Sequence, residues 1–283
     1  MTGFLFPADV FERRAVEEEF RWQSEQLPDD AQIFLLQDTD DPENPWKIIK
    51  QDRFNDETEL VMRGWMLSPA KYAALESYAS SVGCSLTTSA SAYESAHYLP
   101  GWYQLFAEFT PASLWLHPEQ ENTMKQMVDS LNENAYIVKD YVKSRKHEWN
   151  TACFAPSKAR LMPVIKEFIR LQEEDGNGVE GGIVVREFEN FDKDLGEARV
   201  WWVNSSPVLT TPHPDNPEKM PVITAEFLDA LSASVKALGN PFITTDIAVR
   251  LDGSLRVVEV GDGQVSGLPV NQPAEALWKA LRG

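Results

Sequence analysis

An α/β fold is the class that the sequence predicts, from three observations. Of the 283 residues, 43% are hydrophobic and 11% are aromatic, which is enough apolar side chain to build real cores. Short apolar runs of strand length alternate with longer segments of helical character. Serine, threonine and glycine stand where several of those helical segments begin and end. The length predicts two compact domains, or one large domain with a lid.

The first hundred residues predict a small α/β domain. Strands are expected at residues 4–7, 33–38 and 59–65, and helices at residues 10–27 and 68–83. In the second helix, Ser68 suits the N-cap, Pro69 the first helical position and Gly83 the C-terminal end. An aromatic segment at residues 91–115 connects this part of the chain to the next.

The second part of the chain predicts more strands than helices. Strands are expected at residues 135–140 and 181–190, as a pair over residues 197–211 that turns at 204–206, and as a hairpin over residues 242–264. Helices are expected at residues 157–175, at residues 224–239 between Thr224 and Gly239, and near the C-terminus. We therefore expect at least one antiparallel sheet here.

Charge and cysteine content limit the classes of protein. The formal net charge of −18 disfavours general binding to nucleic acids or anionic membranes. The chain has no apolar run of about eighteen residues, which a membrane-spanning helix needs, and its N-terminus lacks the pattern of a signal peptide, so we expect a soluble cytoplasmic protein. Cys84 and Cys153 form neither a disulfide framework nor a zinc pattern, so buried thiols are expected.

One short segment is basic within this acidic chain. The stretch KDYVKSRKHEW, residues 139–149, brings Lys139, Lys143, Arg145 and Lys146 close together. A local cationic patch of this size suits a small anion better than a long polyanion. A solvated helix face is the alternative that composition leaves open.

Two carboxylates lie inside the apolar strands of the last hairpin. The dipeptide Asp252-Gly253 is typical of a two-residue type I′ turn, and that turn would place Asp246 opposite Glu259. Side chains paired in this way lie on one face with their Cβ atoms about 5 Å apart. On a buried face, two carboxylates need a compensating charge. Because hard oxygen ligands suit Mg²⁺ or Mn²⁺, the pair predicts a divalent-cation site.

The same register assigns the neighbouring residues to the two faces of the hairpin. Thr244, Ala248 and Val257 are expected beside the carboxylates, and Ile247, Val249, Val258 and Val260 on the opposite face. Both faces are apolar enough to be covered, which favours the metal site. The alternative is an ordinary solvated face with surface acids.

A family resemblance covers essentially the whole chain. The ordered stretches IVKDYVKS, IVVREFE, EARVWWV, TTDIAV and VVEVGDG resemble the nucleotide-binding core of the ATP-grasp superfamily. The stretches RGWMLSPAKY and AYESAHYLPGWY further resemble a little-characterised branch of small bacterial and phage ATP-grasp proteins. The resemblance implies an N-terminal α/β domain at residues 1–104 and an ATP-grasp domain at residues 105–283. Its two ATP-sandwiching subdomains would meet near residue 185.

The resemblance also implies roles for individual residues. For the nucleotide, it implies contacts from Lys139 and Lys143 to the phosphates, from the hinge residues Glu187, Phe188 and Glu189 to the adenine, and from Glu197 to the ribose or hinge. For catalysis it implies Arg199, which would face the phosphate and acyl-phosphate site, and Arg186 at the start of the hinge. For the metal it implies Asp246 and Glu259, with Asp262 as a candidate third ligand because Gly261 stands where an asparagine is usual.

Arg63 is the candidate for the acceptor substrate. It closes the third expected strand, and the carboxyl ends of strands in α/β sheets host ligands, so its guanidinium is expected to bind a substrate carboxylate. The alternative is a surface ion pair. The four histidines, His97, His117, His147 and His213, show no metal-ligand spacing and are expected to be structural or exposed.

The function that these features predict is an ATP-dependent carboxylate–amine ligase. The resemblance implies ATP and Mg²⁺ (or Mn²⁺) as cofactors, an acyl-phosphate intermediate, and small-molecule or peptide substrates that supply the carboxylate and the amine. Such chemistry needs charge neutralisation and alignment more than a protein nucleophile. Two alternatives stay open: a phosphotransferase on the same fold, and a nucleotide-binding interaction module without catalysis.

Overall fold

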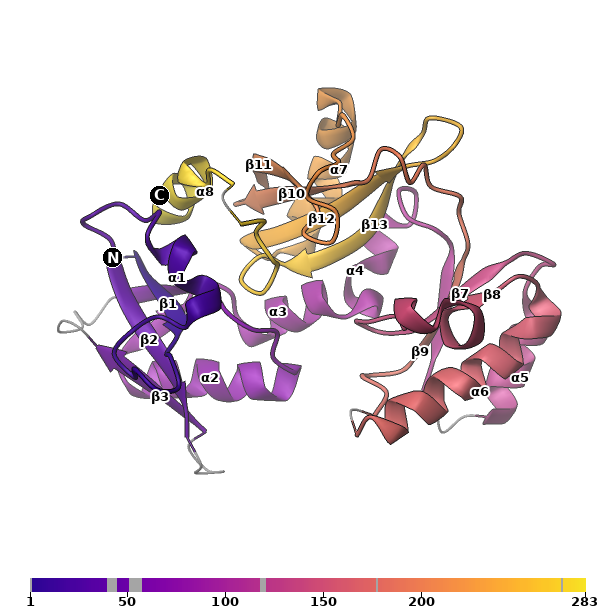
Figure 1. Ribbon diagram of the computed structural model, residues 1–283, viewed down its shortest axis with the longest axis horizontal. Helices are drawn as coiled ribbons and strands as arrows, with labels where there is room; N and C mark the ends of the chain where they lie inside the picture. The colour runs from indigo at the N-terminus through magenta and orange to yellow at the C-terminus, as the bar shows by residue number, and fades with distance from the viewer. Residues whose placement is uncertain (1, 40–44, 51–57, 118–120, 177, 271) are drawn as a thin grey trace.

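Three β-sheets and the helices that pack on them form three lobes (Figure 1). The computed structural model describes residues 2–39, 45–50, 58–117, 121–176, 178–270 and 272–283. In Figure 1 the N-terminal sheet lies at the left, the sheet of β7, β8 and β9 at the right, and the sheet of β10 to β13 above and between them. The protein thus has the mixed α/β architecture that the sequence predicts.

The N-terminal sheet is mostly parallel and has the strand order β3-β2-β1-β4-β5. Its strands are β1 (Thr2–Pro7), β2 (Gln32–Asp38), β3 (Trp46–Lys50), β4 (Thr58–Met62) and β5 (Cys84–Leu86), of which β3 alone is antiparallel to its neighbour. Helix α2 (Pro69–Ser81) covers one face. Helices α1 (Glu18–Ser24) and α8 (Glu275–Arg282) cover the other.

The second sheet is antiparallel, in the order β6-β9-β7-β8. Its strands are β6 (Ser113–Leu116), β7 (Tyr136–Asp140), β8 (Phe154–Ala155) and β9 (Ile183–Glu187). Helices α5 (Glu121–Ser130) and α6 (Lys158–Glu174) share its apolar core. The short helical turns η1 (Lys146–Glu148) and η2 (Trp149–Cys153) connect β7 to β8, so the basic segment of the sequence leaves the end of a central strand.

The third sheet is also antiparallel, in the order β11-β10-β12-β13. Its strands are β10 (Glu197–Val203), β11 (Ser206–Pro212), β12 (Phe242–Val249) and β13 (Leu255–Asp262). Helices α3 (Ala90–His97), α4 (Leu99–Phe106) and α7 (Ala225–Leu238) contribute to the core on one of its faces. The other face is left to the functional cleft and to the N-terminal lobe.

Two of the apolar cores join segments that are far apart in the sequence. Trp278 of α8 packs edge-to-face on Phe4 of β1, with ring centroids 5.8 Å apart. Trp102 of α4 lies in one core with Val200 of β10 and Leu231 of α7. The expected division of the chain at residues 104 and 185 stays a prediction, and packing contacts cross the first of these positions.

Most of the expected helices and strands are confirmed, together with their caps. The hydroxyl of Ser68 accepts a hydrogen bond from the backbone N–H of Lys71, as an N-cap does. Gly239 ends α7 in the left-handed conformation with φ of 71°. Asn204 and Ser205 both have positive φ, which makes the tight turn between β10 and β11.

The helix expected at residues 10–27 is wrong in its first half. The carboxylate of Asp9 accepts hydrogen bonds from the backbone N–H groups of Phe11 and Glu12, and this local turn competes with helix formation. Helix α1 therefore begins only at Glu18. Strands β3 and β6 and helix α5 were not expected from the sequence, because they are short or weakly patterned elements.

The cysteines and the helices agree with two further expectations. Cys84 and Cys153 are both buried thiols. Among the residues that the structure describes, every helix falls short of the length and apolar character that a membrane crossing requires.

Candidate functional site

The turn of the β12–β13 hairpin differs from the expected one. Its loop has three residues, 251–253, and only Gly253 in it has a positive φ, of 85°, so the two-residue type I′ turn was a wrong prediction. A three-residue loop with glycine in the left-handed region is another common hairpin connection. It offsets the strands by one residue near the turn, where Val249 lies opposite Leu255.

A β-bulge then restores the pairing that the sequence predicts. Ile247 lies opposite Val257, whereas Asp246 lies opposite Glu259, so Val258 is the extra residue. The expected pairing of Asp246 with Glu259 is therefore confirmed. The bulge also corrects one assignment of faces, because Val257 lies with Ile247 in the apolar core and not beside the carboxylates.

Asp246 is a buried carboxylate held by an arginine. It is 5% exposed, and its two oxygens accept hydrogen bonds of 2.7 and 2.8 Å from Nε and Nη2 of Arg199. His213 Nε2 lies 3.5 Å from the same carboxylate. Burial alone would raise the pKa of Asp246, but the charge and hydrogen bonds of Arg199 outweigh burial and hold the pKa well below its usual range. The carboxylate is thus ionised at neutral pH.

Glu259 contacts a lysine from the neighbouring sheet. Lys139 of β7 is 7% exposed, and its Nζ lies 3.3 Å from Oε1 of Glu259 and 3.0 Å from the backbone oxygen of Val142. The side chain of Glu259 is 43% exposed, so one part of it faces the protein and another faces solvent. Arg199 and Lys139 therefore supply the positive charge that a facing pair of carboxylates needs.

These four side chains line one cleft between the second and third sheets. The cleft has a volume of about 410 Å³ and is also lined by Lys143, Lys146 and His213. Met66, from the N-terminal lobe, closes one side of it. The segment between β7 and β8 thus delivers cations to the cleft from one sheet, while β10, β12 and β13 deliver carboxylates and an arginine from the other.

A second cavity continues from this cleft toward the N-terminal lobe. It has a volume of about 470 Å³ and shares Met66, His97 and Lys143 with the cleft. Leu67, Ser68, Asp140, Arg145 and Glu180 line its remaining walls. Arg145 is neutralised there by Asp175, 2.7 Å away, and by Glu148, 3.2 Å away. The basic segment therefore divides, with its lysines at the cleft and its arginine in a local ion-pair network.

Glu197 lies beside the cleft and not within it. It lines a smaller cavity of about 300 Å³ together with Lys146 and His213. Burial raises the pKa of Glu197, and the nearby charge of Asp246 raises it further. This position at the edge of the cleft is compatible with the expected contact to a ribose, which stays a prediction.

The three expected hinge residues, Glu187, Phe188 and Glu189, have separate surroundings. The backbone N–H groups of Glu187 and Phe188 donate to the oxygens of Ala112 and Ala135, so both are already used within the protein. The ring of Phe188 packs on Phe154, 4.8 Å between centroids. Their contact to adenine stays a prediction.

Glu189 is bound to an arginine of β13. Its two oxygens accept hydrogen bonds of 3.0 Å from Nε and Nη2 of Arg256. This bidentate ion pair ties the segment after β9 to the last hairpin.

Three other candidates lie outside the cluster of cleft side chains. Arg186 is 7% exposed and donates to Ser113, Thr110 and the backbone oxygen of Val258, with its guanidinium over the ring of Trp102. A buried arginine with these partners is a structural group, which corrects the expected catalytic role.

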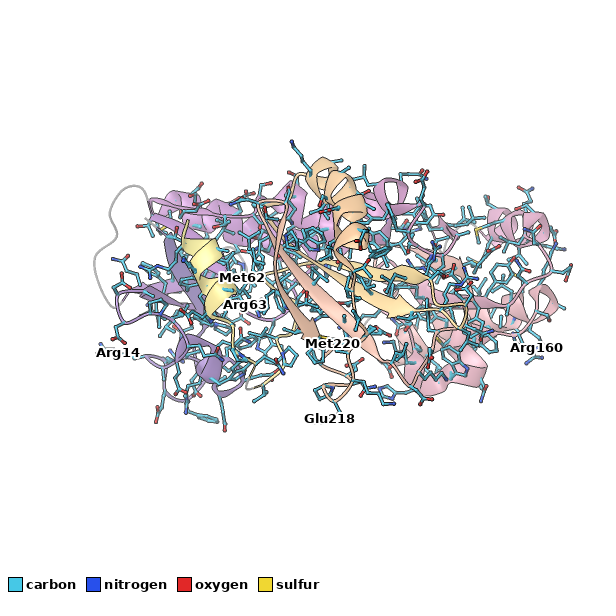
Figure 2. The ribbon with its side chains drawn as sticks, turned by 90° about the horizontal axis from the view of Figure 1, so that it is seen from above. Arg14, Met62, Arg63, Arg160, Glu218 and Met220 are labelled. Atoms are coloured by element: carbon cyan, nitrogen blue, oxygen red, sulfur yellow. The ribbon has the colours of Figure 1, made fainter. Side chains whose placement is uncertain are left out.

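Arg63 is also engaged within the protein. It is 1% exposed, and each of its three nitrogens donates to Gln23 or to the backbone oxygens of Gly263 and Ser266. In Figure 2, Arg63 lies within the molecule beside Met62, whereas Arg14 and Arg160 lie at its two ends. This network corrects both expectations for Arg63, the substrate contact and the surface ion pair.

Asp262 has its carboxylate turned to buried amides. Asn240 donates to one oxygen at 2.7 Å, and the backbone and side chain of Gln264 donate to the other at 2.9 and 3.2 Å. Burial raises its pKa to about 6. Asp262 is thus satisfied by amides at the contact with the N-terminal lobe, and the geometry does not bring it to the Asp246–Glu259 pair as a third ligand.

His213 contacts the residues of the cleft, although its spacing in the sequence predicted only a structural or exposed histidine. Its Nε2 lies 3.0 Å from Nη2 of Arg199, next to Asp246. The signal was present in the β10–β11 hairpin, because a turn at Asn204 and Ser205 brings the end of β11 back beside Arg199.

Comparison with known proteins identifies the family. Residues 130–281 match the model of an ATP-grasp domain family, the third family of its clade, and this range holds Lys139, Arg199, Asp246 and Glu259. The chain belongs to this ATP-grasp family. The resemblance seen in the sequence is confirmed, and with it the expected fold. No curated protein matches the chain.

Solved structures of ATP-grasp ligases share the fold over the whole chain. D-alanyl-alanine synthetase A from Vibrio cholerae has a TM-score of 0.62 at 10% identity, covering 99% of this chain and 97% of that one. VanG D-Ala:D-Ser ligase from Enterococcus faecalis has a TM-score of 0.62 at 13% identity, covering 100% and 98%. The ATP-grasp ligase PsnB, in a complex with a peptide precursor variant, Mg and ADP, has a TM-score of 0.52 at 14% identity, covering 99% and 97%.

The residues at the cleft fit Mg²⁺ only as a metal shared with a phosphate. Within the described part of the chain, no group of three or more histidine, cysteine, aspartate or glutamate side chains is arranged to hold a metal ion by itself. Asp246 and Glu259 offer hard oxygen donors from directly opposite positions of two paired strands. Mg²⁺ is usually held by one or two carboxylates together with substrate phosphates, and this donor set matches that pattern.

Proposed function

We propose that this ATP-grasp protein is an ATP-dependent, Mg²⁺-requiring carboxylate–amine ligase that works through an acyl-phosphate. The observation that carries the proposal is the convergence of Lys139, Arg199, Asp246 and Glu259 from two sheets on one cleft. Fixed cations and a pair of carboxylates are what phosphoryl transfer requires of a protein, since catalysis there is mostly alignment and charge neutralisation.

The side chains of the cleft have distinct roles in this proposal. ATP with Mg²⁺ would supply a transferable phosphoryl group whose charge is neutralised. Lys139 binds phosphate oxygens from the side of β7, and Lys143 and Lys146 add positive charge from the segment that follows. Arg199 binds phosphate from the opposite sheet while it keeps the Asp246 carboxylate in place through two hydrogen bonds. Asp246 and Glu259 are the metal-binding carboxylates.

The proposed reaction balances without a protein nucleophile. An oxygen of the substrate carboxylate forms a bond to the γ-phosphorus, and the bond from that phosphorus to ADP breaks. The amine nitrogen then bonds to the acyl carbon, the carbon–oxygen bond to phosphate breaks, and the amine loses one proton. The products are an amide, ADP and inorganic phosphate.

Small molecules or peptides are the proposed substrates. The related ligases named above act on D-alanine, D-serine or a precursor peptide according to their names. In this chain, Leu67 lines both the cavity beside the cleft and a separate cavity of about 370 Å³ at the carboxyl ends of β1, β2 and β4. Strand ends of this kind commonly host ligands, so we place the acceptor on this side of Met66.

Release of ADP in the presence of candidate substrates tests the proposal. The purified protein is incubated with ATP, Mg²⁺ and pools of amino acids and short peptides, with the variant Lys139→Ala as the matched control. ADP release that requires both a carboxylate and an amine supports the ligase. Phosphorylation without an amine would favour a phosphotransferase instead. Nucleotide binding without turnover under every condition would favour a binding module and refute the ligase.

A further inference from the structure

The bulge at Val258 decides which way Glu259 points. Successive side chains of a strand alternate between its two faces, so a shift of one residue turns a side chain to the other face. If the pairing near the turn continued without the bulge, Val258 would lie opposite Asp246. Glu259 would then point toward the core that holds Ile243, Ile247 and Val257. The bulge is therefore what puts both carboxylates in the cleft.

The bulged backbone is held by contacts from the second sheet and the segment before it. The N–H of Val257 donates to the oxygen of Phe109 at 2.9 Å, and the oxygen of Val257 accepts from the hydroxyl of Thr110 at 2.8 Å. The oxygen of Val258 accepts from Nη1 of Arg186 at 2.6 Å. A bulge disrupts the ladder of strand hydrogen bonds, so outside partners such as these stabilise it.

Arg186 joins these contacts into one unit. Its Nη2 donates to the hydroxyl of Thr110 at 3.2 Å and its Nε to the hydroxyl of Ser113 at 3.1 Å. Its guanidinium carbon lies 5.6 Å from the ring centroid of Trp102, in cation–π geometry. With every nitrogen engaged and the side chain 7% exposed, Arg186 has one defined position.

We infer that Arg186 is a positioning residue that holds the Val258 bulge and thereby keeps Glu259 on the cleft face opposite Asp246. The structural half of this inference concerns the β12–β13 register alone. The functional half, an effect on binding of Mg²⁺ with ATP, rests on the proposed function. A charged donor that is fixed in this way gives a hydrogen bond of the stronger class, so its loss is expected to be measurable.

The test compares Arg186→Gln with Arg256→Gln. Arg256 is the matched control, because it lies on β13, donates to a backbone oxygen at Glu108 and pairs with Glu189, but does not contact the bulge. Amide hydrogen exchange is measured over residues 255–262, and ATP affinity is measured by calorimetry with and without Mg²⁺. For Arg186→Gln we expect exchange at residues 257–260 to accelerate, and the Mg²⁺-dependent gain in ATP affinity to fall, each by about tenfold or more. For Arg256→Gln we expect neither change at residues 257–260.

A second variant keeps the inference testable if Arg186→Gln does not fold. Thr110→Val preserves the shape of the side chain but removes the hydroxyl that contacts both Val257 and Arg186. The same two changes are expected in it, each by about threefold, because one neutral hydrogen bond is lost. Unchanged exchange and unchanged Mg²⁺ dependence in the folded variants would overturn the inference. If the wild-type protein shows no Mg²⁺-dependent ATP affinity, the proposed function fails, while exchange still decides the role of Arg186 in the bulge.

Discussion

Replacing Asp262 by asparagine is predicted to change how the stability of the protein depends on pH. Asp262 is fully buried, and burial raises its pKa from 3.8 to about 6 although Asn240 and Gln264 donate hydrogen bonds to it. Between these two values the unfolded chain has released the proton and the folded protein has kept it. The folded state then binds more protons, so the free energy of unfolding decreases as the pH rises through this range.

The size of the effect follows from the shift in pKa. A shift from 3.8 to about 6 corresponds to a loss of about 3 kcal/mol over the whole range, of which about 1 kcal/mol falls between pH 5 and pH 7.5. That window avoids the isoelectric region near pH 4.6. Asp262→Asn removes the titrating group, so the difference in stability between variant and wild type should shift by about 1 kcal/mol in favour of the variant from pH 5 to pH 7.5.

Urea unfolding at several pH values measures this difference. The control is Asp229→Asn, which changes an exposed aspartate of α7 and should give a difference from wild type that is nearly independent of pH. The reasoning would be refuted if the stability difference between Asp262→Asn and wild type stayed constant from pH 5 to pH 7.5. It would also be refuted if the difference shifted in the opposite direction.

Three further predictions concern the cleft and the fold. Lys139→Ala is expected to weaken ATP binding by about tenfold or more and adenosine binding far less, by calorimetry, since a charge-assisted contact to phosphate is lost; equal losses would mean that Lys139 does not face phosphate. Glu259→Gln is expected to reduce the Mg²⁺ dependence of ATP binding with little change in melting temperature, because Glu259 is 43% exposed, and unchanged Mg²⁺ dependence would remove it from the metal site. Thr224→Ala is expected to lower the free energy of unfolding, measured in urea, by about 1 kcal/mol, because the cap bond to the N–H of Phe227 is lost. The matched change Asp229→Ala, at an exposed position inside the same helix, should not lower it, since alanine is the better helix former there.

The sequence was informative wherever local chemistry decides the structure. Ser68 and Thr224 cap helices, Gly239 ends one, and Asn204 with Ser205 turns a hairpin, all through contacts within a few residues. The family resemblance identified the strands that carry the cleft residues. These features could be found without any knowledge of distant contacts.

Long-range contacts account for what the sequence could not predict. The turn at residues 251–253 and the bulge at Val258 offset each other, so the pairing of Asp246 with Glu259 was right although the turn type was wrong. That bulge depends on Thr110 and Arg186, which are more than seventy residues away in the chain. Arg63 ends a parallel strand, as a ligand-binding residue would, but Gln23 and the segment after β13 surround it.

The core shared by α8 and the N-terminal sheet constrains how the protein can be made. Phe4, Phe6 and Val61 lie in that core with Leu277, Trp278 and Leu281. During synthesis, this face of the sheet stays open to water until residues 274–281 have left the ribosome, and an exposed apolar face favours aggregation. The last part of the chain thus acts as a folding checkpoint for the first, and a message truncated before α8 would yield a product for proteases and not a shorter enzyme.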